Sequence, residues 1–194
     1  MKSFASRIIY WQQSHGRHAL PWQASRDPYR IWLSEIMLQQ TQVATVIPYF
    51  ERFVARFPNL SALAAAHEDE VLALWSGLGY YSRARNLHAA ARAMVENHDG
   101  QFPATPDAIA ELPGVGRSTA AAVAALAFGQ RCAILDGNVR RVLARHGGVA
   151  GWSGDKKVET VLWRLAESRL PRTAIEAYTQ GMMDLGALVC TRSQ

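Results

Sequence analysis

The segment TPDAIAELPGVGRSTAAAVAALAF, residues 105–128, determines the fold that we expect for this chain. Thr105-Pro106 is a strong helix start, because threonine can cap a helix and proline is tolerated in its first turn. Leu112-Pro113-Gly114-Val115-Gly116 then predicts a tight turn. A second helix, rich in alanine, follows from about Arg117 and is stopped by Gly129. The segment therefore predicts two helices joined by a glycine hairpin.

The hairpin is also a candidate site for binding an anion. Glycines let a backbone approach a ligand closely, and the free N–H groups and positive dipole end of the second helix point outward. A DNA phosphate suits such a site, and the predicted phosphate-binding residues are Gly114, Gly116 and Arg117. The residues alone leave open an ordinary glycine turn between packed helices.

Apolar residues recur at helical spacing along most of the remaining chain. Helices are expected at about 3–15, 30–39, 43–57, 61–66, 68–75, 82–97, 139–146, 156–167 and 174–185. The apolar stretch 131–135 has the composition of a strand, but it is too isolated to imply a sheet. The predicted fold class is all-α.

Composition limits the class of protein. The 194 residues are 49% hydrophobic, which suits one large domain or two small ones. A formal net charge of +5 favours a polyanion such as nucleic acid, although many globular proteins are mildly basic. Two cysteines far apart, Cys132 and Cys190, provide no disulfide framework and no zinc spacing. With neither a signal peptide nor a membrane-spanning run in sight, we expect a soluble intracellular protein.

Glu35 is the only ionisable side chain from Ile31 to Gln42, in a segment that is otherwise almost entirely apolar. Burial raises the pKa of a carboxyl group, and an acid that is still protonated near neutral pH can act as a general acid. On a continuous helix, Leu38, Gln39 and Gln42 would lie on the same side as Glu35 and place amides beside it. A structural glutamate that reaches solvent or a salt bridge remains the alternative.

Asp136 follows an apolar pair and precedes Gly137-Asn138-Val139, which is the position of a helix N-cap. A fixed carboxylate can also stabilise the positive charge that develops on deoxyribose when an N-glycosidic bond breaks. The two roles are compatible. The sequence does not show whether Asp136 and Glu35 meet.

The segment from Gly77 to Arg85 combines glycines, Tyr80-Tyr81 and two arginines, Arg83 and Arg85. Such a loop can insert a wedge between stacked bases while arginines hold phosphates. Gln40-Thr41 are predicted to help fill the gap left by a flipped nucleotide. The alternative is that the tyrosines pack in the core and the arginines are solvated. Other basic residues predict a solvated or phosphate-facing surface, namely Arg140, Arg141, Arg145, Lys156 and Lys157.

Six motifs in order resemble the helix-hairpin-helix DNA glycosylase superfamily, and within it the MutY-type adenine DNA glycosylases. They are 20–22 (LPW), 33–42 (LSEIMLQQTQ), 77–81 (GLGYY), 112–119 (LPGVGRST), 136–139 (DGNV) and 183–186 (MDLG). The resemblance implies the helix-hairpin-helix glycosylase fold, with two helical subdomains and an active site in the cleft between them. One subdomain is expected at 26–130 with the hairpin, and the other at 1–25 plus 131–194.

The resemblance also implies a function, the excision of adenine opposite 8-oxoguanine or guanine in duplex DNA. Glu35 matches the acid that protonates adenine, Asp136 the carboxylate that stabilises the sugar cation, and Asn138 a residue that helps hold the catalytic groups. The family positions that line the adenine pocket correspond to Trp22, Leu38 and Gln180. The positions that contact or wedge the lesion-bearing base pair correspond to Gln40, Thr41 and Tyr80.

Ser118 stands where bifunctional relatives of the endonuclease III type carry a lysine that attacks the sugar. Because serine cannot form a Schiff base, we expect a monofunctional enzyme that removes the base without efficient strand cleavage. We also expect the protein to be a monomer in the bacterial cytoplasm and to bind double-stranded DNA that contains mismatched adenine.

Cys190 matches the first of four ligands to a 4Fe–4S cluster, but the other three cysteines are absent. One thiolate cannot hold the cluster, and Cys132 is more consistent with a core residue. The family's C-terminal domain, which helps to recognise oxidised guanine, is also missing, so we expect a fragment or a truncated member. The resemblance further implies a monovalent cation at the hairpin carbonyls.

Two alternatives remain open on the sequence. The chain could be a glycosylase for another base, such as thymine in a mismatch, or a catalytically inactive DNA-binding fragment. The acid at Glu35 and the Gln-Gln-Thr-Gln run favour adenine, since protonating a purine ring nitrogen needs an acid.

Overall fold

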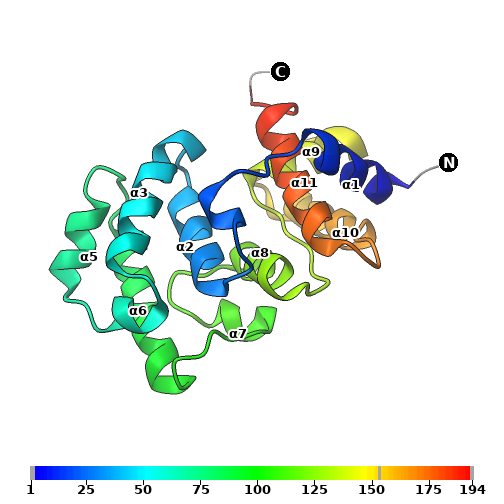
Figure 1. Cartoon of the computed structure of the whole chain (residues 1–194). Helices are drawn as coiled ribbons and strands as arrows, with labels where there is room; N and C mark the ends of the chain where they lie inside the picture. Colours follow the sequence, from blue (N-terminus) through cyan, green and yellow to red (C-terminus); the bar gives the residue numbers. More distant parts are fainter. Residues whose placement is uncertain (1–2, 153, 193–194) are drawn as a thin grey trace.

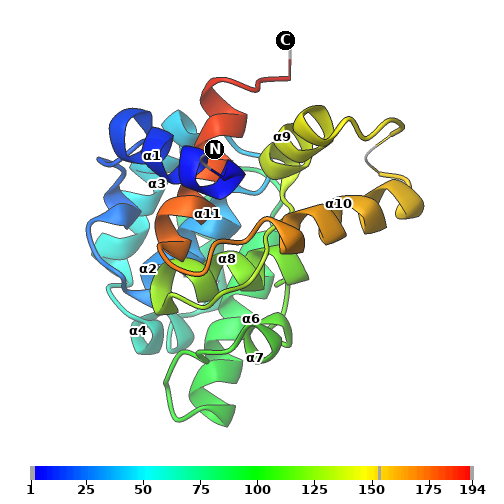
Figure 2. The same cartoon turned by 90° about the vertical axis from the view of Figure 1, so that its right-hand side faces the viewer.

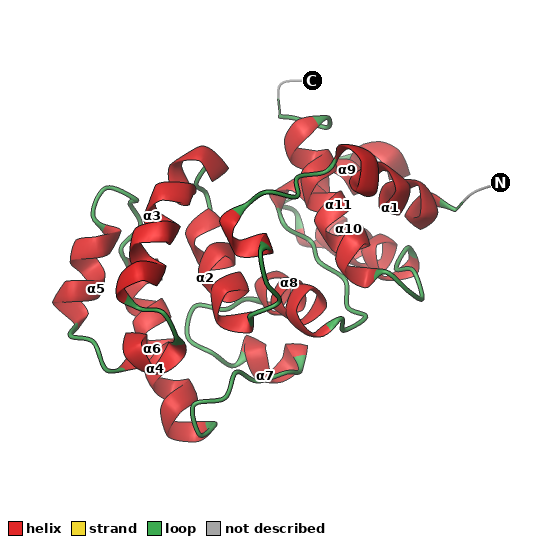
Figure 3. Ribbon diagram, in the orientation of Figure 1, coloured by secondary structure: helices red, strands yellow, loops and turns green. Residues whose placement is uncertain are grey.

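The computed structural model of the chain describes residues 3–152 and 154–192 (Figure 1). Helices account for most of them, and no β-strand occurs among the residues described (Figure 3). The helices are α1 (Phe4–His15), η1 (Pro21–Gln23), α2 (Pro28–Leu38), α3 (Val43–Arg56), α4 (Leu60–Ala64), α5 (Glu68–Trp75), α6 (Ser82–Asn97), α7 (Pro106–Ala110), α8 (Arg117–Phe128), α9 (Gly137–Gly147), α10 (Lys156–Ser168) and α11 (Ile175–Leu188). The expected all-α class is confirmed.

The apolar residues form two cores that share α8. One core lies among α2–α7, and the other among α1, α9, α10 and α11, which group together in both views (Figure 1, Figure 2). Alanine explains the central place of α8, because small side chains let helices pack closely on both sides. Val123 and Ala124 enter the first core, whereas Ala121 and Ala122 enter the second.

The boundaries of the two expected subdomains remain a prediction. Trp22, which the sequence assigned to the subdomain of 1–25 plus 131–194, is buried in the core of α2–α7. Its indole packs edge-on against Phe50, with ring centroids 5.4 Å apart. The segment before residue 26 therefore contributes to both cores rather than to one.

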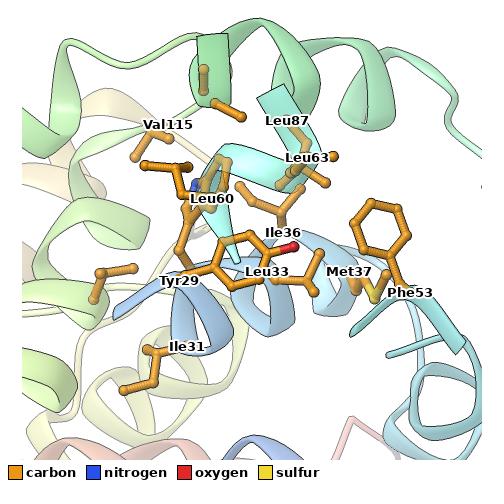
Figure 4. Packing of buried hydrophobic residues seen from close by; sticks show 14 of the residues in the cluster. Tyr29, Ile31, Leu33, Ile36, Met37, Phe53, Leu60, Leu63, Leu87 and Val115 are labelled. Atoms are coloured by element: carbon orange, nitrogen blue, oxygen red, sulfur yellow. The ribbon is translucent and has the colours of Figure 1, made fainter. Parts of the chain in front are cut away.

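The buried helix α2 is the centre of the first core (Figure 4). It begins at Pro28, two residues before the expected Arg30, because the Asp27 carboxylate accepts a hydrogen bond from the Tyr29 N–H at 3.0 Å and caps the helix. Leu33 and Met37 have no exposed surface. A helix buried on nearly every side is what the almost uninterrupted apolar segment predicts.

The end of α2 corrects one expectation. The helix stops at Leu38, Gln39 leaves helical geometry with ψ 111°, and Gln40 has a φ of 58°. Gln42 is the N-cap residue of α3. The prediction that Gln42 shares a helical face with Glu35 is therefore wrong, because the helix that it assumed is broken between them.

The predicted helix–hairpin–helix is present in the structure. The Thr105 hydroxyl accepts a hydrogen bond from the Ala108 N–H at the start of α7, and Gly129 ends α8 with a φ of 65°. After α8, residues 131–135 form a connection without regular secondary structure, not a strand. Its start is held by Arg131, which donates to the carbonyl oxygens of Leu170 and Pro171. Across the part of the chain that is described, no helix combines the length and the apolar character needed to span a bilayer.

Candidate active site

A cleft of about 1530 Å³ lies between the two cores. The sequence predicted ten catalytic or substrate-binding residues, and all of them line this cleft. They are Trp22, Glu35, Leu38, Gln40, Thr41, Tyr80, Ser118, Asp136, Asn138 and Gln180. The cleft thus brings together residues from the first 41 and the last 15 positions of the chain. Their individual roles remain predictions.

Glu35 lies near the middle of α2 and is partly exposed to the cleft. Loss of hydration raises the pKa of its carboxyl group from an ordinary value of 4.5 to about 8, and the negative charge of Asp136 adds to the increase. None of the ion pairs in the described part of the chain involves Glu35. The site therefore holds a carboxylic acid that is largely protonated at neutral pH and can donate a proton into the cleft.

The raised pKa predicts how the stability of the fold depends on pH. Between pH 4.5 and about 8 the unfolded chain releases the Glu35 proton while the folded chain keeps it, so each rise in pH favours unfolding. Glu35→Gln removes this effect. The variant should therefore gain stability over the unchanged chain across this range, by at most about 1.4 kcal/mol per pH unit. Urea unfolding of both proteins from pH 4 to 9 measures the difference, which should be flat below pH 4.5 and above about 8.

Asp136 caps the N-terminus of α9, where its carboxylate accepts a hydrogen bond of 2.7 Å from the Val139 N–H. Burial raises its pKa, whereas the N–H groups of Val139 and Asn138, the Asn138 amide and the charge of Arg141 act in the opposite direction. Glu35 and Asp136 line the same cleft, and the charge of Asp136 raises the pKa of Glu35. The sequence alone did not show whether the two residues share one site.

Asn138 is fixed from two sides. Its Nδ2 donates to Asp136 Oδ2 at 3.4 Å, and its Oδ1 accepts from the Arg141 guanidinium. Arg141 also donates to the carbonyl oxygens of Gly137, Gly186 and Cys190. Gly186 allows this approach, since a Cβ there would lie 2.6 Å from the Cβ of Asn138.

The expected basic surface at α9 needs correction. Arg141 is half-buried in the network just described, and Arg140 is half-buried and donates to Glu159 and to the Leu135 carbonyl oxygen. Arg145 is exposed, but it contacts the sulfur of Cys190. Lys156 and Lys157 are exposed as predicted. The two half-buried arginines hold α9 against neighbouring segments, because carbonyl oxygens and one carboxylate fill their donor positions.

Asp184, one turn further along α11, fixes the orientation of the Gln180 amide. The Asp184 carboxylate is fully buried, accepts from Gln180 Nε2 at 2.9 Å and forms an ion pair with Arg17 at 2.6 Å. The backbone N–H of Arg17 donates to the same carboxylate at 2.8 Å. Because a carboxylate only accepts, Gln180 must turn its NH₂ group to Asp184, and its carbonyl oxygen is the group left to offer to the cleft.

Arg17 and Asp184 are residues that the sequence reasoning missed, and Arg17 lines the cleft. A signal was present for Asp184, which is the only charged side chain in the apolar run 181–188 of α11. This is the same pattern that singled out Glu35. Nothing comparable marked Arg17, whose partner lies 167 residues away.

Asp184→Asn should destabilise the fold by about 3 kcal/mol, because it leaves the Arg17 guanidinium beside a neutral partner in a largely buried position. The exposed pair Arg56–Glu70 provides the matched control, and Glu70→Gln should cost less than about 1 kcal/mol. Urea denaturation of both variants makes the comparison. Equal effects would mean that burial adds nothing to the Arg17–Asp184 pair.

Ser118 lies in the first turn of α8, and its hydroxyl accepts a hydrogen bond of 2.9 Å from the Leu135 N–H. The contact ties α8 to the connection that leads to Asp136. The chain has three lysines, Lys2, Lys156 and Lys157, and none is among the described residues that line the cleft. The described cleft therefore contains no amine nucleophile.

The hairpin before α8 lies outside the cleft lining; its glycines are exposed, whereas Leu112 and Val115 are buried in the first core. Gly114 has a φ of 75°, and a Cβ there would lie 2.6 Å from the Cβ of Asn86, so glycine is required on two grounds. Gly116 faces open space, and the N-terminus of α8 has no side-chain cap. Arg117 is exposed, pairs with Glu167 and lies 3.8 Å from the Trp163 ring centroid. An anion at the hairpin would compete with Glu167 for Arg117.

The chain matches the family described as HhH-GPD superfamily base excision DNA repair protein over residues 33–168. The matched region carries Glu35, the hairpin and Asp136. The chain belongs to this family.

Known relatives and solved structures agree with this HhH-GPD assignment. An adenine DNA glycosylase of Buchnera aphidicola subsp. Acyrthosiphon pisum is 46% identical over 96% of the chain and 53% of its own length. The structure of a thermostable thymine-DNA glycosylase aligns with a TM-score of 0.88 and 31% identity, over 98% of this chain and 88% of that one. A non-covalent endonuclease III–DNA complex gives a TM-score of 0.81 at 22% identity, over 98% and 86% of the two chains, and supports the fold alone. The chain spans about half the length of the curated relatives it matches.

The residues of this HhH-GPD chain do not fit the 4Fe–4S cluster that the resemblance implies. Among the described residues, no group of three or more His, Cys, Asp or Glu side chains could hold a metal ion. Cys190 contacts Arg145, whereas Cys132 donates to the Ala121 carbonyl oxygen and packs against both cores. Burial raises the pKa of the Cys132 thiol, which disfavours the thiolate that metal binding needs.

Proposed function

We propose that the chain excises adenine from duplex DNA in which it is mispaired with 8-oxoguanine or guanine, by hydrolysis of the N-glycosidic bond. The observation that carries the proposal is the pair of carboxyl groups in the cleft. Glu35 has a pKa raised to about 8, and the neighbouring Asp136 carries the charge that helps to raise it. An acid beside a carboxylate suits the removal of a base that leaves as a protonated purine.

In the proposed mechanism, Glu35 donates its proton to a ring nitrogen of an adenine that has been flipped into the cleft. The bond between the base nitrogen and the sugar C1′ then breaks, and its electron pair leaves with the adenine. Asp136 stabilises the resulting positive charge on the sugar. Water adds to C1′, and the proton that it releases returns to the Glu35 carboxylate. The products are free adenine and an abasic site, and the acid is restored.

Gln180 supports adenine as the base. With its NH₂ group held by Asp184, its carbonyl oxygen is left as an acceptor for a base in the cleft. That oxygen can accept from the exocyclic amino group of adenine, whereas thymine has no amino group and only its N3–H to donate. Excision of thymine is nevertheless the second candidate, because the thermostable thymine-DNA glycosylase is 31% identical to this chain.

Duplex DNA is the proposed partner, with the exposed hairpin at Gly114 and Gly116 and the uncapped N-terminus of α8 holding a phosphate. Binding through phosphates should weaken steeply as salt rises. A monovalent cation at the hairpin carbonyls, action as a monomer and a place in the bacterial cytoplasm belong to the same proposal. Sedimentation of the chain with and without duplex tests the stoichiometry.

The test uses the whole 194-residue chain with duplexes that carry adenine opposite 8-oxoguanine, adenine opposite guanine, or thymine opposite guanine. Free bases are quantified, and the DNA is examined with and without alkali. We expect adenine release, with strand breaks that appear only after alkali because the described cleft has no lysine. Thymine release without adenine release would favour the second candidate. Duplex binding with no release would mean that the chain is a DNA-binding module without activity.

A further inference from the structure

Arg83 is a buried arginine that the proposed chemistry does not use. It lies in the first turn of α6, and only 8% of its surface is exposed. The sequence left open whether Arg83 holds a phosphate with Arg85 or is solvated, and its burial excludes both readings for Arg83. Arg85 is exposed and pairs with Glu68.

The guanidinium of Arg83 joins two segments that are far apart in the chain. Its Nη1 donates to the carbonyl oxygens of Ile36, Met37 and Gln39 at 3.1, 2.9 and 2.6 Å. Its Nη2 donates to the carbonyl oxygens of Leu78 and Gly79 at 3.2 and 3.1 Å, and to Thr41 Oγ1 at 3.3 Å. One planar group therefore holds both the C-terminal end of α2 and the loop before α6.

Each of these segments presents one strained residue to the cleft. Gln40 has a φ of 58° and Tyr80 a φ of 50°, in the left-handed region that residues other than glycine rarely adopt. Both are exposed, and both line the cleft. Such conformations persist only where the surroundings enforce them. The Arg83 guanidinium carbon lies 5.5 Å from the Tyr80 ring centroid, so the arginine also supports that ring directly.

The burial of Arg83 has no electrostatic compensation from a carboxylate. None of the ion pairs among residues 3–152 and 154–192 includes it, and its Nε has no hydrogen-bond partner there. A buried cation that is held only by neutral acceptors is expensive for stability. Such a residue is better explained by the geometry that it imposes than by a gain in stability.

We propose that Arg83 is a positioning residue that locks the turn of Gln40 and the loop of Tyr80 into one rigid unit, which holds open the gap in the duplex while adenine is extruded. The inference rests on the proposed function. It places the effect of Arg83 on the extrusion step, not on DNA affinity and not on proton donation by Glu35. Substitution of Arg83 should consequently slow excision while binding and the pH dependence stay as they are.

The experiment compares Arg83→Met and Arg83→Lys in the full chain with the matched surface variants Arg92→Met and Arg92→Lys. Arg92 is an exposed arginine further along α6 that pairs with Glu96. Methionine keeps part of the apolar stem and removes every donor, whereas lysine keeps the charge but cannot reach both segments with a planar group. Four quantities are measured on a duplex with adenine opposite 8-oxoguanine: Kd, the single-turnover excision rate at saturating protein, its pH midpoint, and the fluorescence of 2-aminopurine next to the adenine.

We expect excision to slow about 100-fold in Arg83→Met and about tenfold in Arg83→Lys. The fluorescence rise that reports extrusion should fall in parallel, Kd should stay within about threefold, and the pH midpoint should not move. The Arg92 variants should lie within about twofold of the unchanged chain. Circular dichroism checks folding, and if Arg83→Met does not fold, Arg83→Lys decides.

Two results would overturn the inference. One is an Arg83 effect no larger than the Arg92 effect. The other is a slow Arg83 variant whose fluorescence rise is intact, which would place the defect in the chemical step. A chain that releases no adenine at all would refute the proposed function instead. The fluorescence comparison between the Arg83 and Arg92 variants would still decide the role of Arg83.

Discussion

Glu35→Gln is expected to slow adenine excision by about 10²- to 10⁴-fold, the range that a well-placed general acid contributes. Glutamine has nearly the same shape as protonated glutamic acid, and its NH₂ can donate a hydrogen bond but cannot release a proton to the base. The cleft should therefore still accept adenine. The single-turnover rate constant for adenine release and the Kd for the duplex measure the two properties separately.

Glu51→Gln is the matched control, because Glu51 is exposed on the neighbouring helix α3. Glu51→Gln should keep the rate constant for adenine release and the Kd for the duplex within about twofold of the unchanged chain, as is usual for a surface substitution. Glu35→Gln should leave Kd within about threefold. Excision by Glu35→Gln at the rate of the unchanged chain would remove Glu35 from the mechanism, and loss of DNA binding would make it a structural residue.

Asp136→Asn is expected to slow excision by about 10²- to 10³-fold, because it removes a fixed negative charge from the sugar cation. Asparagine caps helices as well as aspartate does, so the hydrogen bond from the Val139 N–H is kept and the melting temperature should change little. The substitution also removes a charge that raises the pKa of Glu35. The alkaline limb of the rate profile should consequently move to lower pH.

Asp155→Asn is the control for the role of a helix cap. Asp155 caps α10, where its carboxylate accepts from the Lys157 N–H at 2.7 Å, and it is exposed away from the cleft lining. Asp155→Asn should change neither the rate of adenine excision nor the pH dependence of that rate. If Asp136→Asn behaves like Asp155→Asn, Asp136 is a cap and nothing more.

Some cleft residues could be found from the sequence because an ionisable side chain in an otherwise apolar helix stands out locally. Glu35 stands out as an acid in an apolar helix, but Asp184 has the same signal and a different environment. Asp184 is fully buried against Arg17, whereas Glu35 has no cationic partner among the described residues. Only the fold separates a paired structural acid from an acid without a cationic partner, since the deciding neighbour is distant in sequence.

The arginines were the least predictable residues. Arg83 and Arg141 were both assigned to a phosphate-facing or solvated surface, but Arg83 is buried and Arg141 is half-buried. Most of their acceptors are backbone carbonyl oxygens, which every residue carries and which leave no mark in a sequence. The all-α fold and the glycine hairpin, by contrast, depend on local helix periodicity and turn residues, and these were predictable.

The end of α2 shows a further limit. The run 31–42 predicts a helix that continues past Leu38, but the structure breaks it at Gln39 and Gln40. The carbonyl oxygens freed there are bound by Arg83 from α6. A contact across more than 40 residues thus decides where the helix stops.

The central claim, that a protonated Glu35 donates the proton that releases adenine, is tested most directly by the pH dependence of excision. The second-order rate constant for adenine release from a duplex with adenine opposite 8-oxoguanine is measured at subsaturating protein from pH 5 to 10, since this quantity reports the pKa of the free protein. The rate constant should fall about tenfold per pH unit above pH 8, the pKa of Glu35, and this limb should be absent in Glu35→Gln. A rate constant that stays level to pH 10, or a limb that persists in Glu35→Gln, would contradict the account.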